Sequence, residues 1–138
     1  MLDLRRTRTA TFPETEAHSL LDLKDAHVAW KDEGDESGLR HLVQPMESLL
    51  RHLPQIFVKD TAVDAICHGS NLAVPGVTKL SPGIKRGDLV AVLSAKGEGV
   101  ALANAMMTSD AIVIAKSGLA ADSKRVLMDP GTYPKLWK

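Results

Sequence analysis

The stretch "LVAVLSAKGEGVALANAMM" (residues 89–107) decides the fold class of this chain. Two apolar runs, residues 89–95 and 100–107, flank the segment "KGEG" (96–99), which has the composition of a hairpin turn. The first run is almost continuously apolar, as is typical of a strand that is buried on both faces. These residues therefore predict a hairpin of two apolar strands in a β-rich domain.

Further short strands are predicted around this hairpin. The stretch "IFVKD" (56–60) is β-branched and aromatic, and "VTKLS" (77–81) alternates between apolar and polar residues. Residues 119–129 are interpreted as one long strand or as a strand pair. Five or six short strands within roughly 80 residues favour a small, partly closed barrel.

Two short helices accompany these strands. In residues 61–69, Thr61 and Asp64 have the spacing of a capping box, and Gly69 suits the C′ position, where a positive φ is common. Residues 108–118 form the second candidate helix.

The first third of the chain has a helical pattern. One stripe along residues 20–33 has helical spacing, formed by Leu20, Leu23, His27 and Trp30. A second helix is predicted over 38–52, in which Pro45 suits the start of a fresh turn. Residues 1–19 contain the strand-like "LRRTRTATF" without a partner strand, so we expect this segment to be extended, poorly ordered and mobile.

Together these patterns predict an α+β protein. A helical N-terminal segment, residues 1–53, precedes a small β-rich, partly closed barrel with one or two short helices, residues 54–138. The boundary is placed near Pro54, where helical periodicity gives way to strands. A chain of 138 residues has the length of one domain, or of one small domain with an appendage.

Composition excludes several classes of site. There are 17 basic and 17 acidic residues, with a balance of −3 over residues 1–53 and +3 over residues 54–138, so the second part is the better candidate for a phosphate-facing surface. One cysteine permits no internal disulfide, and no histidine pairing indicates a metal site. Cys67 beside His68 is interpreted as a packed core thiol rather than a catalytic pair, since adjacent helical residues point in different directions. We expect no metal, no cofactor, no membrane span and a cytoplasmic location, because phosphate loops, nucleophile elbows, long apolar runs and a signal peptide are all missing.

The loop "HGSNLAVPG" (68–76) has two interpretations. Composition alone favours a structural turn. The alternative is an RNA-reading surface, because small side chains leave backbone N–H and C=O groups accessible to unstacked bases. Four basic residues nearby in the sequence are candidates for phosphate contacts, namely Lys59, Lys79, Lys85 and Arg86.

Long stretches of the chain resemble a known family. "AICHGSNLAVPGVTKLSPGIKRGDLVAVLSAKGE", "ALANAMMTS" and the terminal "TYPKLW" are similar to the PUA domain of dyskerin-type pseudouridine synthases, the TruB-related, RNA-guided enzymes of box H/ACA particles. The archaeal branch is the more similar. Upstream, "LRRTRTATF" resembles the "LRRTRSGPF" segment that closes the TruB-type catalytic core, and "QPMESLLRHLP" resembles the link into the PUA domain.

The resemblance implies a PUA pseudo-barrel that binds RNA, holding the ACA tail and lower stem of a box H/ACA guide RNA. It also implies as partners that guide RNA and either the other box H/ACA core proteins or a separate catalytic chain. The segments that it places at the RNA are the helix Val63–His68, the loop Gly69–Gly76 and the strand around Val77–Lys79. The candidate RNA-binding residues are accordingly Val63, Ile66, His68, Gly69, Ser70, Ala73, Val74, Pro75 and Gly76, together with the nearby basic residues Lys59, Lys79, Lys85 and Arg86.

Two departures from the family pattern concern catalysis. The catalytic aspartate of the family lies in a Gly-Thr-Leu-Asp-like motif upstream of the "LRRTR" segment, and this sequence does not contain it. The family arginine that pairs with this aspartate corresponds to Arg6, or alternatively to Arg5, and we expect it to be vestigial here. In addition, "TRTATF" replaces "TRSGPF", and the glycine of a turn is lost.

The sequence is compatible with three functions. The first is an RNA-binding module that is inactive alone, as expected of the C-terminal part of a longer enzyme. The second is one subunit of a split pseudouridine synthase. The third is a PUA-like protein-interaction domain, since fold does not fix function.

Overall fold

The computed structural model describes residues 3–135 and divides into two compact units, with the division after His52. Leu136 and Trp137 of the "TYPKLW" stretch lie outside the described residues.

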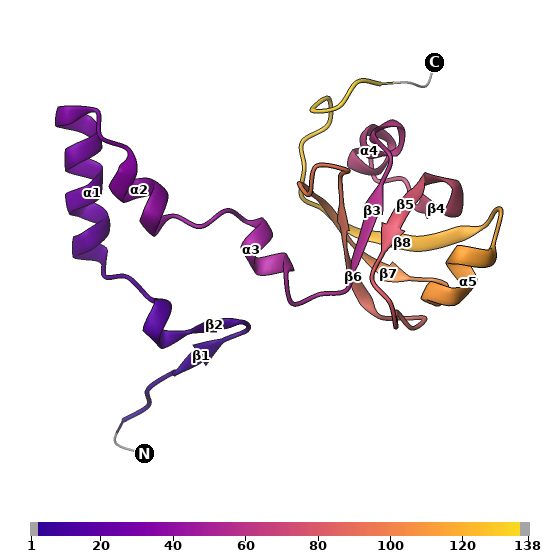
Figure 1. Ribbon diagram of the computed structural model, residues 1–138, viewed down its shortest axis with the longest axis horizontal. Coiled ribbons are helices and arrows are strands. Elements are labelled where there is room, and N and C mark those ends of the chain that lie inside the picture. The colour runs from indigo at the N-terminus through magenta and orange to yellow at the C-terminus, as the bar shows by residue number, and fades with distance from the viewer. Residues whose placement is uncertain (1–2, 136–138) are drawn as a thin grey trace. The chain divides into compact units, whose positions relative to one another are not determined.

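The second unit is built on one six-stranded sheet with the order β4-β8-β7-β6-β3-β5 (Figure 1). The α+β class and the number of short strands are as predicted. The strands are β3 Gln55–Val58, β4 Leu72–Ala73, β5 Val77–Leu80, β6 Leu89–Leu93, β7 Gly99–Ala105 and β8 Leu119–Val126. Residues 119–129 thus supply one long strand and not a pair.

The predicted hairpin lies at the centre of this sheet. Strand β6 pairs antiparallel with β7, with Val92 opposite Ala101, and parallel with β3, with Ile56 opposite Val92. Val90 and Val92 have no exposed surface. The nearly continuous apolar run is therefore explained by burial on both faces, as predicted.

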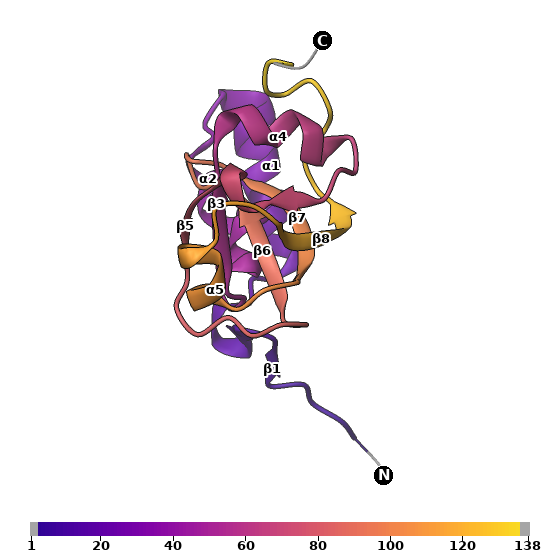
Figure 2. The same ribbon diagram turned by 90° about the vertical axis from the view of Figure 1, so that its right-hand side faces the viewer.

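Helices α4 (Asp60–Cys67) and α5 (Ser109–Ile114) lie at opposite ends of this unit (Figures 1 and 2). The predicted capping box on α4 is wrong, because the helix begins earlier, after Lys59, and Thr61 falls inside its first turn. The other end is as predicted. Gly69 has φ +87°, its N–H donates to the Ile66 carbonyl, and the next N–H donates to Ala65, which is a Schellman cap.

The described part of the first unit, residues 3–52, contains three α-helices. Helix α1 (Leu20–Glu33) matches the prediction and begins at a capping box of Ser19 and Asp22. The single helix predicted over 38–52 is wrong: the chain forms α2 (Ser37–Leu42) and the one-turn α3 (Glu47–Leu50) instead. Pro45 lies between them and prevents a continuous helix, because it lacks an N–H and disfavours the helical conformation of the residue before it.

The N-terminal segment forms a small hairpin of β1 (Arg8–Thr9) and β2 (Phe12–Pro13), followed by the 3-10 turn η1 (Glu14–Glu16). The expectation that this strand lacks a partner is wrong, because the partner is supplied by the next few residues. The turn needs a left-handed residue, and Ala10 takes it with φ +51°. Within residues 3–135, Ala10 is the one non-glycine residue with a positive φ.

Candidate nucleic-acid interface

A cavity of about 420 Å³ lies between α4 and the loop that follows it. We call it the α4 cavity. Its walls are mainly small and apolar, with three polar side chains, and its lining comprises Lys59, Thr61, Ala62, Ala65, Ile66, Asn71, Leu72, Ala73, Pro75 and Gly76.

The helical wall of the α4 cavity follows from sequence spacing. Thr61 and Ala65 are one helical turn apart, as are Ala62 and Ile66, so that all four project to one side of α4. The opposite wall approaches closely at Gly76, where an added Cβ would lie 3.2 Å from the Ala62 Cβ. This close approach favours glycine.

Backbone hydrogen bonds hold the loop wall in place. The Lys59 N–H donates to the Gly76 carbonyl at 2.9 Å, which ties the loop to the start of α4. The Val74 N–H donates to the Gly118 carbonyl at 2.9 Å, next to strand β8. The loop is therefore an ordered part of the domain with both turn geometry and an accessible surface.

The structure brings together five of the residues predicted from the sequence. Lys59, Ile66, Ala73, Pro75 and Gly76 all line the α4 cavity. The other five lining residues were not named as candidates: Ala65, Asn71 and Leu72 lie within the helix and loop predicted to bind RNA, whereas Thr61 and Ala62 lie outside those segments. Ala62 lies one helical turn before Ile66, so helical spacing could have predicted its place in the lining. The placement of Asn71 and Leu72 depends on the pairing of β4, a strand too short to be recognised in the sequence.

Other predicted residues lie away from the α4 cavity. Val63 is fully buried and Val74 is 7% exposed, so both side chains belong to the hydrophobic core. His68, Gly69 and Ser70 are exposed at the C-terminal end of α4 and do not line the cavity.

The predicted cations are distributed over separate places. Lys79 lies on β5 with its Nζ 5.5 Å from the centre of the Phe57 ring, and it lines a second cavity of about 320 Å³. Lys85 and Arg86 are exposed in the turn before β6, where the Lys85 N–H donates to the Asp88 carboxylate at 2.8 Å. Only Lys59 lies at the α4 cavity itself.

Cys67 is a buried free thiol, as the core interpretation predicted. Burial, with the Asp64 carboxylate as a second cause, raises the pKa of this thiol, which disfavours the nucleophilic thiolate. The neighbouring His68 ring does not pair with it; its Nδ1 lies 2.8 Å from the Asp64 carbonyl. Among residues 3–135, no cluster of three histidine, cysteine or carboxylate side chains has a metal-binding arrangement.

The two candidate arginines of the N-terminal segment differ in their contacts. The Arg5 Nε donates to both carboxylate oxygens of Glu14, at 2.8 and 3.0 Å. Arg6 is exposed, makes no hydrogen bond or ion pair with the residues that the structure describes, and lines a hollow of about 340 Å³ beside the hairpin.

The described part of the chain contains no helix with both the length and the apolar character needed to cross a membrane.

Family models match both units of the chain. Residues 54–127 match the PUA domain, and residues 1–51 match the tRNA pseudouridylate synthase B C-terminal domain. A probable tRNA pseudouridine synthase B from Methanopyrus kandleri is 56% identical over 137 residues, and one from Methanocaldococcus jannaschii is 51% identical over 138 residues. These alignments cover 99% and 100% of this chain but only 40% and 41% of the relatives, so the chain spans about two fifths of their length.

Solved structures agree with these matches. A chain from an H/ACA RNP bound to a substrate RNA containing 2′-deoxyuridine superposes with a TM-score of 0.91 at 48% identity, over 96% of this chain and 42% of that one. A chain from an archaeal box H/ACA Nop10–Cbf5 complex gives a TM-score of 0.90 at 47% identity, over 96% of this chain and 43% of that one. The chain therefore belongs to the PUA domain family, and the segment before this domain is of the tRNA pseudouridylate synthase B type.

Proposed function

We propose that the chain binds RNA through its PUA unit as part of RNA pseudouridylation, holding the ACA tail and lower stem of a box H/ACA guide RNA. The observation that carries this proposal is the α4 cavity, whose small apolar walls suit the flat face of an unstacked base. The similarity to a chain of an H/ACA RNP bound to a substrate RNA supports it.

The predicted residues take different parts in this proposal. Ile66, Ala73, Pro75 and Gly76 form walls against a base, while Lys59 neutralises a phosphate at the rim of the α4 cavity. Val63 and Val74 support those walls from the core. His68, Gly69 and Ser70 lie beyond the cavity, and Lys79, Lys85 and Arg86 provide further phosphate contacts along the stem.

A binding titration tests the proposal. The full chain is titrated with an H/ACA hairpin that carries an intact ACA tail and with the same hairpin after replacement of the tail, at physiological salt. Each lost base contact is expected to cost about 1–3 kcal/mol of binding free energy, so the replaced tail should bind at least about tenfold more weakly. Equal affinity for the two RNAs would contradict the proposal.

The proposed setting is a ribonucleoprotein particle in the cytoplasm. Partner proteins named with the similar chains are Nop10 and Gar1, and we propose contacts of this kind for the chain within such a particle. A buried free cysteine suits a reducing compartment.

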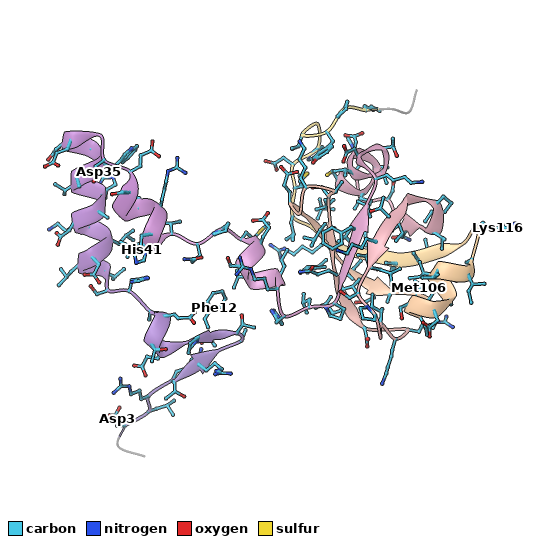
Figure 3. The ribbon with its side chains drawn as sticks, viewed as in Figure 1. Asp3, Phe12, Asp35, His41, Met106 and Lys116 are labelled. Atoms are coloured by element: carbon cyan, nitrogen blue, oxygen red, sulfur yellow. The ribbon has the colours of Figure 1, made fainter. Side chains whose placement is uncertain are left out.

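A second candidate function is that of a subunit of a split pseudouridine synthase. The observation that favours it is the exposed apolar surface of the first unit, where Leu20 is 84% and Leu21 71% exposed. Leu20 also lines a cavity of about 710 Å³, together with residues that include Phe12 and His41 (Figure 3). Ser48 also lines this cavity, although its hydroxyl is buried and has no hydrogen-bond partner among the described residues. A protein segment carrying apolar side chains would cover the exposed leucines.

Arg6 is the residue that this second function would employ. Its guanidinium has no partner among the described residues, whereas Arg5 is held by Glu14, so we propose Arg6 as the arginine that meets a catalytic aspartate from another chain. A search of the flanking DNA for an open frame with a Gly-Thr-Leu-Asp motif tests this function. If the whole genome has no such frame, the split-enzyme function is excluded and the RNA-binding function is unaffected.

A further inference from the structure

Asn71 is the polar residue of the α4 cavity whose orientation the fold determines. Its side-chain Oδ1 accepts a hydrogen bond from the Ser123 N–H at 3.0 Å, although the two residues are 52 positions apart in the chain. Asn71 directly precedes β4, and Ser123 lies in β8, at the position where the β7–β8 register shifts. The hydrogen bond thus fastens the cavity loop to an irregular part of the sheet.

This hydrogen bond fixes which way the carboxamide faces. A backbone N–H can donate only to the oxygen of the amide, so the Nδ2 group is turned away from Ser123. Neither of the two Nδ2 hydrogens is donated to another residue in the described range 3–135. The oxygen keeps one further lone pair, so that the amide presents a donor beside an acceptor in one plane.

The other polar groups of the α4 cavity do not offer such a pair. Lys59 carries three rotatable donors and no acceptor, and acts as a point charge that suits a phosphate. The Thr61 hydroxyl rotates freely and accepts or donates with little directional preference. Among the described lining residues, Asn71 is therefore the group with a fixed hydrogen-bond polarity.

We propose that Asn71 is a specificity-determining residue that reads an amino-bearing base, adenine or cytosine, held in the α4 cavity. This inference rests on the proposed RNA-binding function. Adenine and cytosine present an exocyclic amine beside a ring-nitrogen acceptor, which complements Oδ1 and Nδ2 in a bidentate contact. Guanine and uracil present a carbonyl beside a ring N–H, and matching them in the same base orientation would require an amide flip that the Ser123 N–H opposes.

Atomic changes in the RNA test this inference. Adenine is replaced by inosine, and cytosine by uracil, at one tail position at a time, which exchanges the amine for a carbonyl with little change in shape. The dissociation constant of the full chain for each hairpin is measured. At one or more positions the exchange should weaken binding by about tenfold or more.

The protein variant is Asn71→Asp, which keeps an oxygen for the Ser123 N–H and removes both Nδ2 donors. It should bind the intact tail about 10–100-fold more weakly. The exchange penalty, meaning the factor by which replacing the base at the sensitive position weakens binding, should fall below about threefold. Ser70→Asp is the matched control, since it adds the same charge at an exposed neighbour outside the cavity lining. This control should weaken binding of all RNAs alike and retain the exchange penalty, and thermal unfolding should show both variants folded.

The outcomes separate this inference from the proposed function. If the wild-type chain discriminates between the tails and Asn71→Asp does so equally, Asn71 does not read the base and only this inference fails. If the wild-type chain binds intact and fully replaced tails equally, ACA reading and this inference both fail. If Ser70→Asp abolishes the penalty as Asn71→Asp does, the effect comes from charge, and the role of the amide is refuted.

Discussion

At the residue scale, Ala10 occupies a backbone conformation that favours glycine. Its φ of +51° brings Cβ close to the backbone, at a cost of about 1 kcal/mol that glycine avoids. The similar family segment "LRRTRSGPF" has glycine at this position. The strain is therefore a specific consequence of the alanine in "TRTATF".

Ala10→Gly is accordingly expected to stabilise the N-terminal hairpin by about 1 kcal/mol. The measurement is amide exchange of the Glu14 N–H, which donates to the Thr7 carbonyl at 2.9 Å across the hairpin. Ala17→Gly is the control, because Ala17 has φ −78° and gains nothing from glycine. Unchanged Glu14 protection in Ala10→Gly would show that the turn does not limit hairpin stability.

Gly76 is a second residue at which the structure favours glycine, in this case because space is limited. An added Cβ would lie 3.2 Å from the Ala62 Cβ and 3.3 Å from the Leu72 Cδ1. Gly76→Ala should destabilise the chain by about 1–3 kcal/mol in urea unfolding, as expected of overpacking. In an Ala62→Gly background the same substitution should cost less, and equal costs in both backgrounds would contradict a steric origin.

At the element scale, the segment after β8 is fastened to the turn between β6 and β7. The Tyr133 hydroxyl donates to the Glu98 carboxylate, the Ser94 hydroxyl donates to the same oxygen, and the Lys96 Nζ lies 5.6 Å from the Tyr133 ring centre. The Tyr133 hydrogen bond, followed by that of Ser94, lowers the pKa of the Glu98 carboxyl. The same bond to Glu98 raises the pKa of Tyr133.

These shifts predict how stability depends on pH. A lowered pKa of Glu98 contributes stability above the ordinary value of 4.5, and this contribution is lost as the pH falls through the lowered pKa. A raised pKa of Tyr133 contributes stability below the ordinary value of 10.0, and it is lost as the pH rises through the raised pKa. Tyr133→Phe should therefore lower the Tm at pH 7, and the difference from wild type should shrink below pH 4.5.

The comparison variant for the Tyr133–Glu98 hydrogen bond is Glu98→Gln, whose side chain cannot ionise. Its Tm deficit should also shrink as the pH falls below 4.5, because the wild-type carboxylate becomes protonated there. A Tyr133→Phe deficit that stays constant between pH 7 and pH 3 would show that the hydroxyl acts independently of the charge of Glu98.

Elements were predictable from the sequence where they depend on nearby residues. The β6–β7 hairpin pairs two segments that follow one another across a single turn, and the Gly69 cap involves contacts within a few positions. Both appear in the sequence as apolar runs, turns and glycine. The parallel pairing of β3 with β6 and the two-residue strand β4 depend on segments tens of residues away, which local patterns do not encode. For the same reason the predicted RNA-binding residues included Ala73 and Gly76 but missed Asn71, whose orientation depends on Ser123.

At the scale of the whole molecule, the two units differ in how much apolar surface they bury. The large hydrophobic cluster consists of residues between Ile56 and Tyr133, all in the second unit. In the first unit, α1 has no buried residue. Tertiary packing normally supplies most of the stability of a helix, so the first unit should open locally far more readily than the second.

Limited proteolysis should therefore remove the first unit before it cuts the second. Mass spectrometry should detect an early product that begins near residue 53 and retains a cooperative thermal transition. Amides of residues 3–19 should exchange rapidly in the isolated chain. Strong exchange protection of that segment, or early cleavage between residues 56 and 128, would contradict this prediction.

The hydrogen bond between Asn71 and Ser123 has a consequence for biosynthesis. A ribosome delivers α4 and its loop well before it delivers β8, yet the loop is fastened to β8 by this bond and by the β4–β8 pairing. The α4 cavity is consequently incomplete until the chain has emerged beyond residue 123, and closing so long a loop is a slow step. Nascent chains stalled before that point should not retain the RNA, so that recognition becomes possible only for a chain whose sheet is already assembled.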